Sequence, residues 1–165
     1  MELKLTTKTK GKTPRESAVE TRYLLMPHQA NPSGTAFGGE IVAWMDMVAG
    51  MAAYRHAGQE VVTVSIDTLS FKEPIHVGEQ VVLKASVNYV GRTSMELGIK
   101  VIKDDSTRGT QVVATTAYMT FVALDEKKSP AELPRMIPET AEEKRRFEQG
   151  KQRFLERKKR REKLS

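Results

Sequence analysis

Alternating apolar and polar side chains predict five β-strands along the chain. In the first, Val19 and Tyr23 alternate with Glu20 and Arg22, which is the period of a strand buried on one face. The other four runs are also enriched in β-branched residues. We expect the strands at residues 17–26, 61–71, 80–90, 94–103 and 110–124. Because short turns rich in Gly and Asp join the last three, they are expected to pair as antiparallel neighbours.

One long apolar stretch, residues 41–54, contains a single charged side chain, Asp46. The stretch has few β-branched residues and is too short to cross a bilayer, so it predicts a buried helix. Gly58 follows where a left-handed residue would end that helix. A helix and an antiparallel sheet that bury each other's apolar faces predict a two-layer α+β fold.

The length of 165 residues fits one main domain with short extensions. We divide the chain into a flexible segment (1–16), a globular domain (17–124), a Pro-rich hinge (125–138) and a basic helical tail (139–165). The sequence has no cysteine, which excludes a disulfide framework and thiolate chemistry and suits a reducing compartment. Since no run of about 18 apolar residues occurs, we expect a cytoplasmic protein without a membrane partner.

The net charge of +6 comes almost entirely from the tail. Residues 139–165 hold 11 Lys and Arg against 6 Asp and Glu, whereas residues 1–138 hold 16 against 15. The nearly neutral body argues against nucleic-acid binding. We interpret the tail as a solvated helix. The alternative is a role for the tail in binding nucleic acid or phosphate. A thin apolar stripe, Phe147, Phe154 and Leu155, could also dock the tail on the body or on a neighbouring subunit.

Asp46 is the first candidate for chemistry, because an ionised carboxylate in an apolar helix requires a compensating partner or a function. A structural pairing with Arg55, or a hydrogen bond to a neighbouring loop, would satisfy it without any catalysis. A catalytic use is equally compatible with the helix pattern, since both structural networks and active sites hold such carboxylates.

The loop before the helix is rich in Gly and contains Asn31, Gly34, Gly38 and Gly39. Unpaired N–H groups at a helix N-terminus favour a developing negative charge, so this segment could form an oxyanion site. Asn31 could orient a carbonyl group or a water molecule. The alternative is that the glycines only shape a turn and that Asn31 caps it.

The three histidines are interpreted as ordinary residues. His56 and His76 lie near predicted turns and are expected on the surface. His28 stands three residues before Asn31 and could orient it, although a plain loop residue is the favoured reading. No spacing of His, Asp and Glu resembles a metal site, and no Gly-x-Ser-x-Gly turn supports a serine hydrolase.

Residues 17–124 resemble the hot-dog-fold acyl-CoA thioesterases of the acyl-CoA hydrolase type. The resemblance rests on the combination of several short motifs, each weak by itself. They are Asn31-x-x-Gly34-x-x-x-Gly38-Gly39 with Asp46 seven residues later, Val62-Thr63-Val64, Phe71-x-x-Pro74-x-x-x-Gly78-Glu79, and Gly91-Arg92-Thr93-Ser94-Met95. The resemblance implies a five-stranded antiparallel sheet wrapped around one long buried helix, to which this chain adds its charged C-terminal helix.

The resemblance also implies an activity, the hydrolysis of acyl-CoA to free acid and CoA, with no cofactor and no metal. Asp46 would act as general base or as nucleophile, facing Asn31 of a second chain, with Gly39 at the oxyanion site. Two domains would pair, and three such dimers would assemble. The residues implied in substrate binding are Gly38, Thr63, Arg92, Thr93 and Ser94. A non-catalytic acyl-CoA-binding module on the same fold is the alternative.

Overall fold

The computed structural model describes residues 10–67 and 69–164 of the chain. Its helices are α1 (Pro14–Ser17), η1, a short 3-10 helix (Pro27–Gln29), α2 (Gly38–Ala57) and α3 (Ala141–Leu164). Its strands are β1 (Val19–Leu24), β2 (Val61–Ile66), β3 (Gln80–Val90), β4 (Ser94–Asp105) and β5 (Thr110–Ala123). The strands form one sheet in the order β1-β3-β4-β5-β2, and every neighbouring pair is antiparallel.

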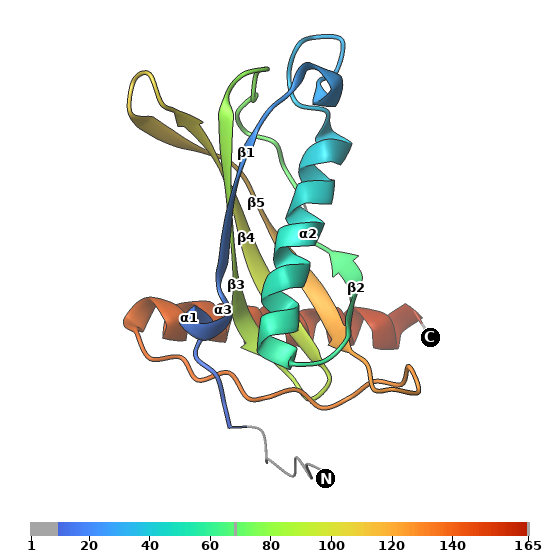
Figure 1. The fold of residues 1–165 in the computed structure, drawn as a ribbon. Coiled ribbons are helices and arrows are strands. Elements are labelled where there is room, and N and C mark those ends of the chain that lie inside the picture. The colour runs from blue at the N-terminus through green and yellow to red at the C-terminus, as the bar shows by residue number, and fades with distance from the viewer. Residues whose placement is uncertain (1–9, 68, 165) are drawn as a thin grey trace, which may run out of the picture.

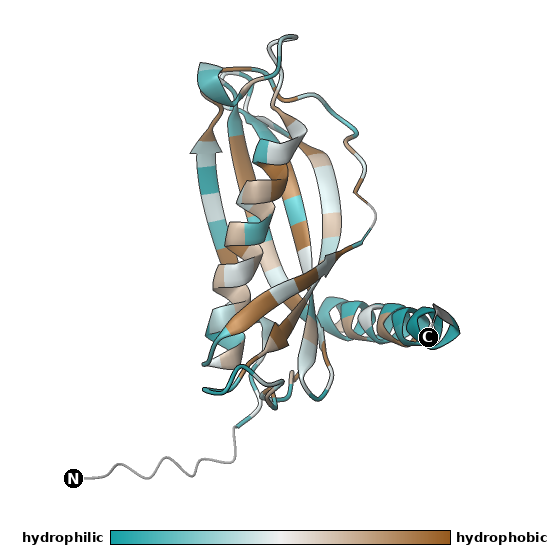
Figure 2. Cartoon of the chain, turned by 90° about the vertical axis from the view of Figure 1, so that its right-hand side faces the viewer, coloured by the Kyte–Doolittle hydropathy of each residue, from teal (hydrophilic) through white to brown (hydrophobic). Residues whose placement is uncertain are grey.

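The sheet curls around α2, which runs along its concave side (Figure 1). Figure 2 shows the apolar residues of the strands in brown, and the buried ones, such as Leu83 and Leu97, form one core cluster with apolar residues of α2. Trp44 stacks on Tyr23 of β1 with ring centroids 4.6 Å apart and planes 4° apart. Gly58 ends α2 with a φ of 64°, as the sequence predicts. The predicted α+β architecture is therefore confirmed.

Only one side of α2 is buried in the single chain. Ile41, Met45 and Val48 are almost fully covered by the sheet. On the opposite side, Met47 and Met51 are 52% and 44% exposed. The helix that the sequence predicts to be buried all round thus keeps an apolar stripe uncovered.

The first and second strands are shorter than predicted. Residues 10–16, expected to be loose, hold a backbone hydrogen bond from Lys12 to the Arg135 carbonyl oxygen at 2.8 Å and the buried Pro14 of α1. Residues 1–9 lie outside the described part of the chain. β2 has a bulge between Thr63 and Ser65 and ends at Ile66. Beyond it, residues 69–79 form a loop rather than a continued strand.

His56 is fully buried, so the prediction of a surface position is wrong. It occupies the last turn of α2, where the chain after β5 folds back over it. Its Nε2 donates a hydrogen bond to the Pro134 carbonyl oxygen at 2.9 Å. Among the described residues its Nδ1 has no hydrogen-bond partner. Burial lowers the pKa of His56, while the hydrogen bond to Pro134 opposes that shift.

α3 crosses the outer, convex face of the sheet (Figures 1 and 2). Phe147 and Phe154 pack on Tyr89 of β3, with ring centroids 5.2 and 5.3 Å apart. Gly150 allows this approach, because a Cβ there would lie 2.8 Å from the Cβ of Tyr89. The docked alternative for the tail is therefore correct, and the solvated helix is wrong.

Ion pairs complete the docking of α3. Glu96 of β4 is 1% exposed, and its carboxylate accepts hydrogen bonds from Arg153 at 2.7 Å and from Arg157 at 3.0 Å. Arg157 also donates to Asp67, just beyond β2, at 2.6 Å. Arg153 lies over the ring of Tyr118 at 3.6 Å from its centroid. The helix thus supplies the cations that neutralise a carboxylate buried in the sheet.

We expect Arg153→Ala to lower the free energy of unfolding by about 2 to 3 kcal/mol, because the buried carboxylate of Glu96 would lose its bidentate partner. Urea denaturation checks this value. Arg160→Ala, an exposed arginine on the same helix, is the matched control and should leave stability nearly unchanged. Equal stability of both variants would show that α3 docking does not depend on the Glu96 ion pair.

We also expect stability to fall as the pH drops below about 6.5, the ordinary pKa of histidine. The folded chain holds the pKa of His56 below that value. As the pH falls, the unfolded chain therefore binds the proton first, and this binding stabilises the unfolded state relative to the folded one. His56→Gln keeps a donor for Pro134 and should flatten this dependence in urea denaturation between about pH 7.5 and 5.5. His28→Gln, at an exposed site, should retain the wild-type slope.

Candidate active site

The loop before α2 is shaped by the side chain of Asn31. Its Oδ1 accepts hydrogen bonds from the backbone N–H groups of Ser33 at 3.0 Å and Thr35 at 3.2 Å. Its Nδ2 donates to Thr35 Oγ1 at 2.9 Å. The turn-capping alternative is thus correct for the oxygen of Asn31. A second hydrogen on Nδ2 is left for a ligand, in an orientation that the loop already fixes.

Asn31 and Gly38 line one cavity of about 400 Å³ at the N-terminus of α2. Its other walls are mixed: apolar residues such as Ile41 and Phe71 stand beside the polar residues Thr35, Lys72 and Glu73. Within the described chain, the N–H groups of Gly38 and Gly39 have no acceptor. These two donors and the helix dipole favour a partial negative charge, such as that on a polarised carbonyl oxygen.

Gly39 is held to glycine by its neighbour. A Cβ at this position would lie 2.5 Å from the ring of Phe37, the residue before the helix. Gly38 has more room, since its Cβ would lie 3.5 Å from the Phe71 ring. The two glycines therefore leave the helix N-terminus open to a ligand between two aromatic rings.

Asp46 lies two turns further along α2, on the exposed side of the helix. Its Oδ1 accepts a hydrogen bond from Thr63 Oγ1 of β2 at 2.7 Å. Arg55, the alternative partner, instead donates to the Ala18 carbonyl oxygen at 3.3 Å. The neutral hydroxyl of Thr63 thus orients the carboxylate of Asp46. Within the described chain, the second carboxylate oxygen accepts no hydrogen bond.

The turn between β3 and β4 holds Arg92, Thr93 and Ser94. Backbone hydrogen bonds fix it, from Gly91 N–H to the Ser94 oxygen at 2.8 Å and from Ala123 N–H to the Thr93 oxygen at 3.0 Å. The guanidinium of Arg92 is exposed and lies 4.0 Å from Glu132. Such an exposed, long-range pair leaves the cation free to meet another anion.

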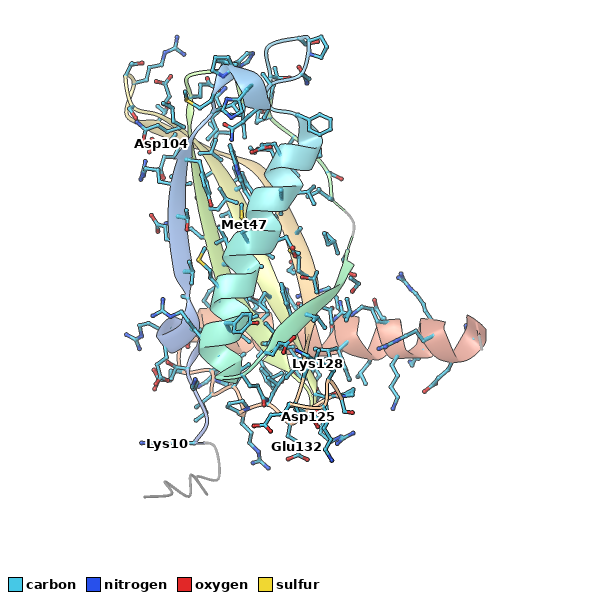
Figure 3. All side chains as sticks on the ribbon, turned by 45° about the vertical axis from the view of Figure 1, so that its right-hand side comes forward. Lys10, Met47, Asp104, Asp125, Lys128 and Glu132 are labelled. Carbon is cyan, nitrogen blue, oxygen red and sulfur yellow. The ribbon has the colours of Figure 1, made fainter. Side chains whose placement is uncertain are left out.

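One chain does not bring these groups together. Asn31 and the glycines lie at the end of the molecule where α2 begins, whereas the β3–β4 turn lies at the other end (Figure 1). Asp46 is halfway between them, beside Met47, which Figure 3 shows on the exposed side of α2. A span of eight helical residues separates Gly38 from Asp46, or about 12 Å.

Two residues that line the cavity, Thr35 and Phe71, were not among the predicted site residues, and neither was Phe37 beside Gly39. The spacing Asn31-x-x-x-Thr35 signals a side-chain-capped turn and could have identified the first. Phe71 was included in a predicted strand, and only the end of β2 at Ile66 turns it toward the cavity.

Residues 10–67 and 69–164 contain no group of three His, Asp or Glu side chains placed to hold a metal ion. None of the described helices is long and apolar enough to cross a membrane.

Comparison with known proteins identifies the family. The thioesterase superfamily model matches residues 33–110. An uncharacterized acyl-CoA thioester hydrolase of Bacillus subtilis is 40% identical over 129 residues, which cover 78% of this chain and 75% of that protein. The chain belongs to the thioesterase superfamily.

Solved structures agree with this membership. The acyl-CoA hydrolase of Staphylococcus aureus, solved with butyryl-CoA, CoA and CoA disulfide, superposes with a TM-score of 0.87 at 35% identity and covers 93% of each chain. A hexameric acyl-CoA thioesterase superposes with a TM-score of 0.87 at 36% identity, over 92% of this thioesterase and 97% of that chain. The hot-dog fold is therefore confirmed.

The Staphylococcus enzyme has also been solved as alanine variants of an asparagine, an aspartate and a threonine. In its sequence the aspartate follows the asparagine by 15 residues and the threonine follows the aspartate by 17. Asn31, Asp46 and Thr63 of this thioesterase have the same separations.

Proposed function

We propose that this thioesterase hydrolyses the thioester of acyl-CoA to a free acid and CoA, with Asp46 as its reactive carboxylate. The observation that carries the proposal is the Asp46–Thr63 hydrogen bond of 2.7 Å on an exposed face of α2. The matching spacing in a CoA-binding hydrolase supports the same three residues. A pure binding protein would have no use for an oriented carboxylate at a carbonyl site.

The proposed site is shared between two chains. The exposed apolar residues of α2 and of the edge strand β2 form one surface, which we call the α2–β2 face: Met47, Met51, Tyr54, Val62, Val64 and Ile66. A strand edge and an apolar surface of this kind are covered when a second copy pairs with them about a twofold axis. Such pairing of β2 with its copy is antiparallel, so each chain's α2 N-terminus approaches the opposite end of its partner.

In this dimer, Asn31, Gly38 and Gly39 of one chain would bind the carbonyl oxygen of a thioester beside Asp46 of the other. The two free N–H groups and the remaining Nδ2 hydrogen would stabilise the charge that develops on that oxygen. The acyl chain would occupy the side of the cavity that Ile41 and Phe71 line. The hydrolysis itself needs only water as a second reactant.

Two routes are open for Asp46, and each balances. As general base, its free oxygen takes a proton from water while the water oxygen bonds to the carbonyl carbon, after which the C–S bond breaks and the CoA thiolate is protonated. As nucleophile, the carboxylate oxygen bonds to that carbon, CoA leaves, and water hydrolyses the mixed anhydride. Single turnover in ¹⁸O-labelled water distinguishes them, because only the nucleophilic route can leave a label in Asp46.

CoA would extend from this site along the β3–β4 turn of one subunit. Arg92 could pair with a phosphate, and Thr93 and Ser94 could donate hydrogen bonds to phosphate or pantetheine. By analogy with its hexameric neighbour, we infer a trimer of such dimers. We also predict that the enzyme needs no cofactor and that it is located in the cytoplasm.

We expect Asp46→Asn to lower kcat by about a hundred- to ten-thousand-fold. Release of free thiol from acyl-CoA substrates of increasing chain length measures both the activity and its preference. The fold should persist, since Asp46 is exposed in the single chain. Glu148→Gln on α3 is a matched control that removes an exposed carboxylate far from the cavity. Wild-type turnover by the Asp46 variant would refute the assignment.

We expect activity to return when inactive Asp46→Asn and Asn31→Ala chains are unfolded, mixed and refolded. Mixed dimers would contain one intact site, so recovery should approach about a quarter of wild-type activity. Each variant refolded alone provides the baseline. If mixed dimers form, as tagged subunits can prove, and activity stays at that baseline, the site lies within one chain.

A further inference from the structure

A second cavity, of about 490 Å³, lies between α3 and the outer face of the sheet. We call it the α3 groove. It is separate from the candidate active site, because α2 and the Asn31 loop are on the concave side of the same sheet (Figure 1). Its volume falls in the range of small-molecule sites, about 300 to 1,000 Å³.

The strands contribute two lysines to the groove. Lys84 of β3 and Lys100 of β4 are directly opposite each other in the register of the sheet. Like charges in this arrangement destabilise a sheet. Glu20 offsets Lys84 at 3.2 Å, but Lys100 has no anionic partner within the described chain. The pair is therefore under repulsion unless an anion lies over it.

The helix contributes a further excess of positive charge. Arg145 and Arg146 both donate to the carboxylate of Glu142, at 2.6 and 2.9 Å. Hydrogen bonds from these two arginines lower the pKa of Glu142 to about 2, so it stays ionised at neutral pH. Even so, one anion faces two cations. Arg153, deeper in the groove, is already paired with Glu96.

The floor between these cations comes from strands β3, β4 and β5 of the sheet. Ser86 and Gly98 are opposite each other in the register, and Gly98 is in turn opposite Tyr118. All three line the groove. The Asn88 side chain lies against Gly98 and the Arg153 guanidinium lies over the Tyr118 ring, so a ligand meets these side chains, while its anionic groups meet cations from both the strands and the helix.

We propose that the α3 groove binds a small molecule that carries a diphosphate. Its phosphate oxygens are bound by Lys84 and Lys100 from below and by Arg145 from the side. Two phosphates are needed to match cations from two elements, and lysines and arginines are the side chains that bind phosphate most strongly. The diphosphate comes either from a free metabolite or from a CoA molecule.

Inorganic pyrophosphate is the probe, titrated calorimetrically into the full chain. Lys100→Gln and Lys84→Gln should each raise the Kd for pyrophosphate by about ten-fold or more, since each removes one charge-assisted contact. Lys144→Gln, on an exposed part of the same helix outside the groove, is the matched control and should bind like wild type. Binding should weaken with added salt.

Two further readouts separate a ligand site from a structural role. Without ligand, both lysine variants should melt at the wild-type temperature or above it, because they relieve repulsion. Pyrophosphate binding should also survive in Arg92→Gln, which lies outside the groove. Calorimetric competition separates the two sources: displacement of bound pyrophosphate by CoA identifies CoA as the source of the diphosphate, and pyrophosphate that stays bound in the presence of CoA identifies a free metabolite.

Four results would overturn the proposal: no binding of pyrophosphate, equal binding by the lysine variants, loss of binding in Arg92→Gln, or a change of oligomeric mass in the lysine variants. The last would show that the groove is a contact between copies of the chain. Because calorimetry requires no turnover, failure here leaves the proposed hydrolysis untouched, and an inactive enzyme leaves this test intact.

Discussion

The packing of α2 into the curled sheet is the constraint on which the rest of the molecule depends. Side chains from all five strands of the sheet cover one side of α2, and the sheet leaves the other side of the helix uncovered. This asymmetry leaves Asp46 accessible while the helix that carries it is held rigidly. It also sets Gly38 and Gly39 at the end of a fixed element, so their N–H groups keep one direction. Catalytic geometry of this kind is more reliable on a packed helix than on a loop.

Much of the fold follows from local patterns. β3 was predicted at its observed bounds, and β4, β5 and α2 within a few residues, because alternation, β-branched residues and turn-forming glycines agree there. β2 is shorter than its apolar run because a bulge after Thr63 and the loop toward Pro74 end its regular pairing. His56 escaped prediction because its cover comes from Pro134, 78 residues later in the chain.

The docking of α3 shows where such patterns stop being informative. Phe147 and Phe154 were visible as a thin apolar stripe, but the decisive partner of Arg153 is Glu96, a charged residue that local pattern assigns to a solvated strand face. For the candidate site, residue types and their positions pointed to Asn31 and Asp46, and the family resemblance added Thr63. Pattern alone could not show that Thr63 rather than Arg55 orients Asp46, since that depends on how β2 lies against α2.

The glycine at position 150 also bears on the order in which the molecule assembles. A glycine in mid-helix costs about 1 kcal/mol relative to alanine, and the many cationic side chains around it repel one another in an isolated helix. α3 therefore gains its stability from the sheet and folds onto a surface that must exist beforehand. During synthesis, the sheet residues 80–123 leave the ribosome before α3, so Glu96 stays hydrated until α3 docks. The outer face of the sheet is therefore completed only after the strands have formed, and the carboxylate buried there keeps its water until its arginines arrive.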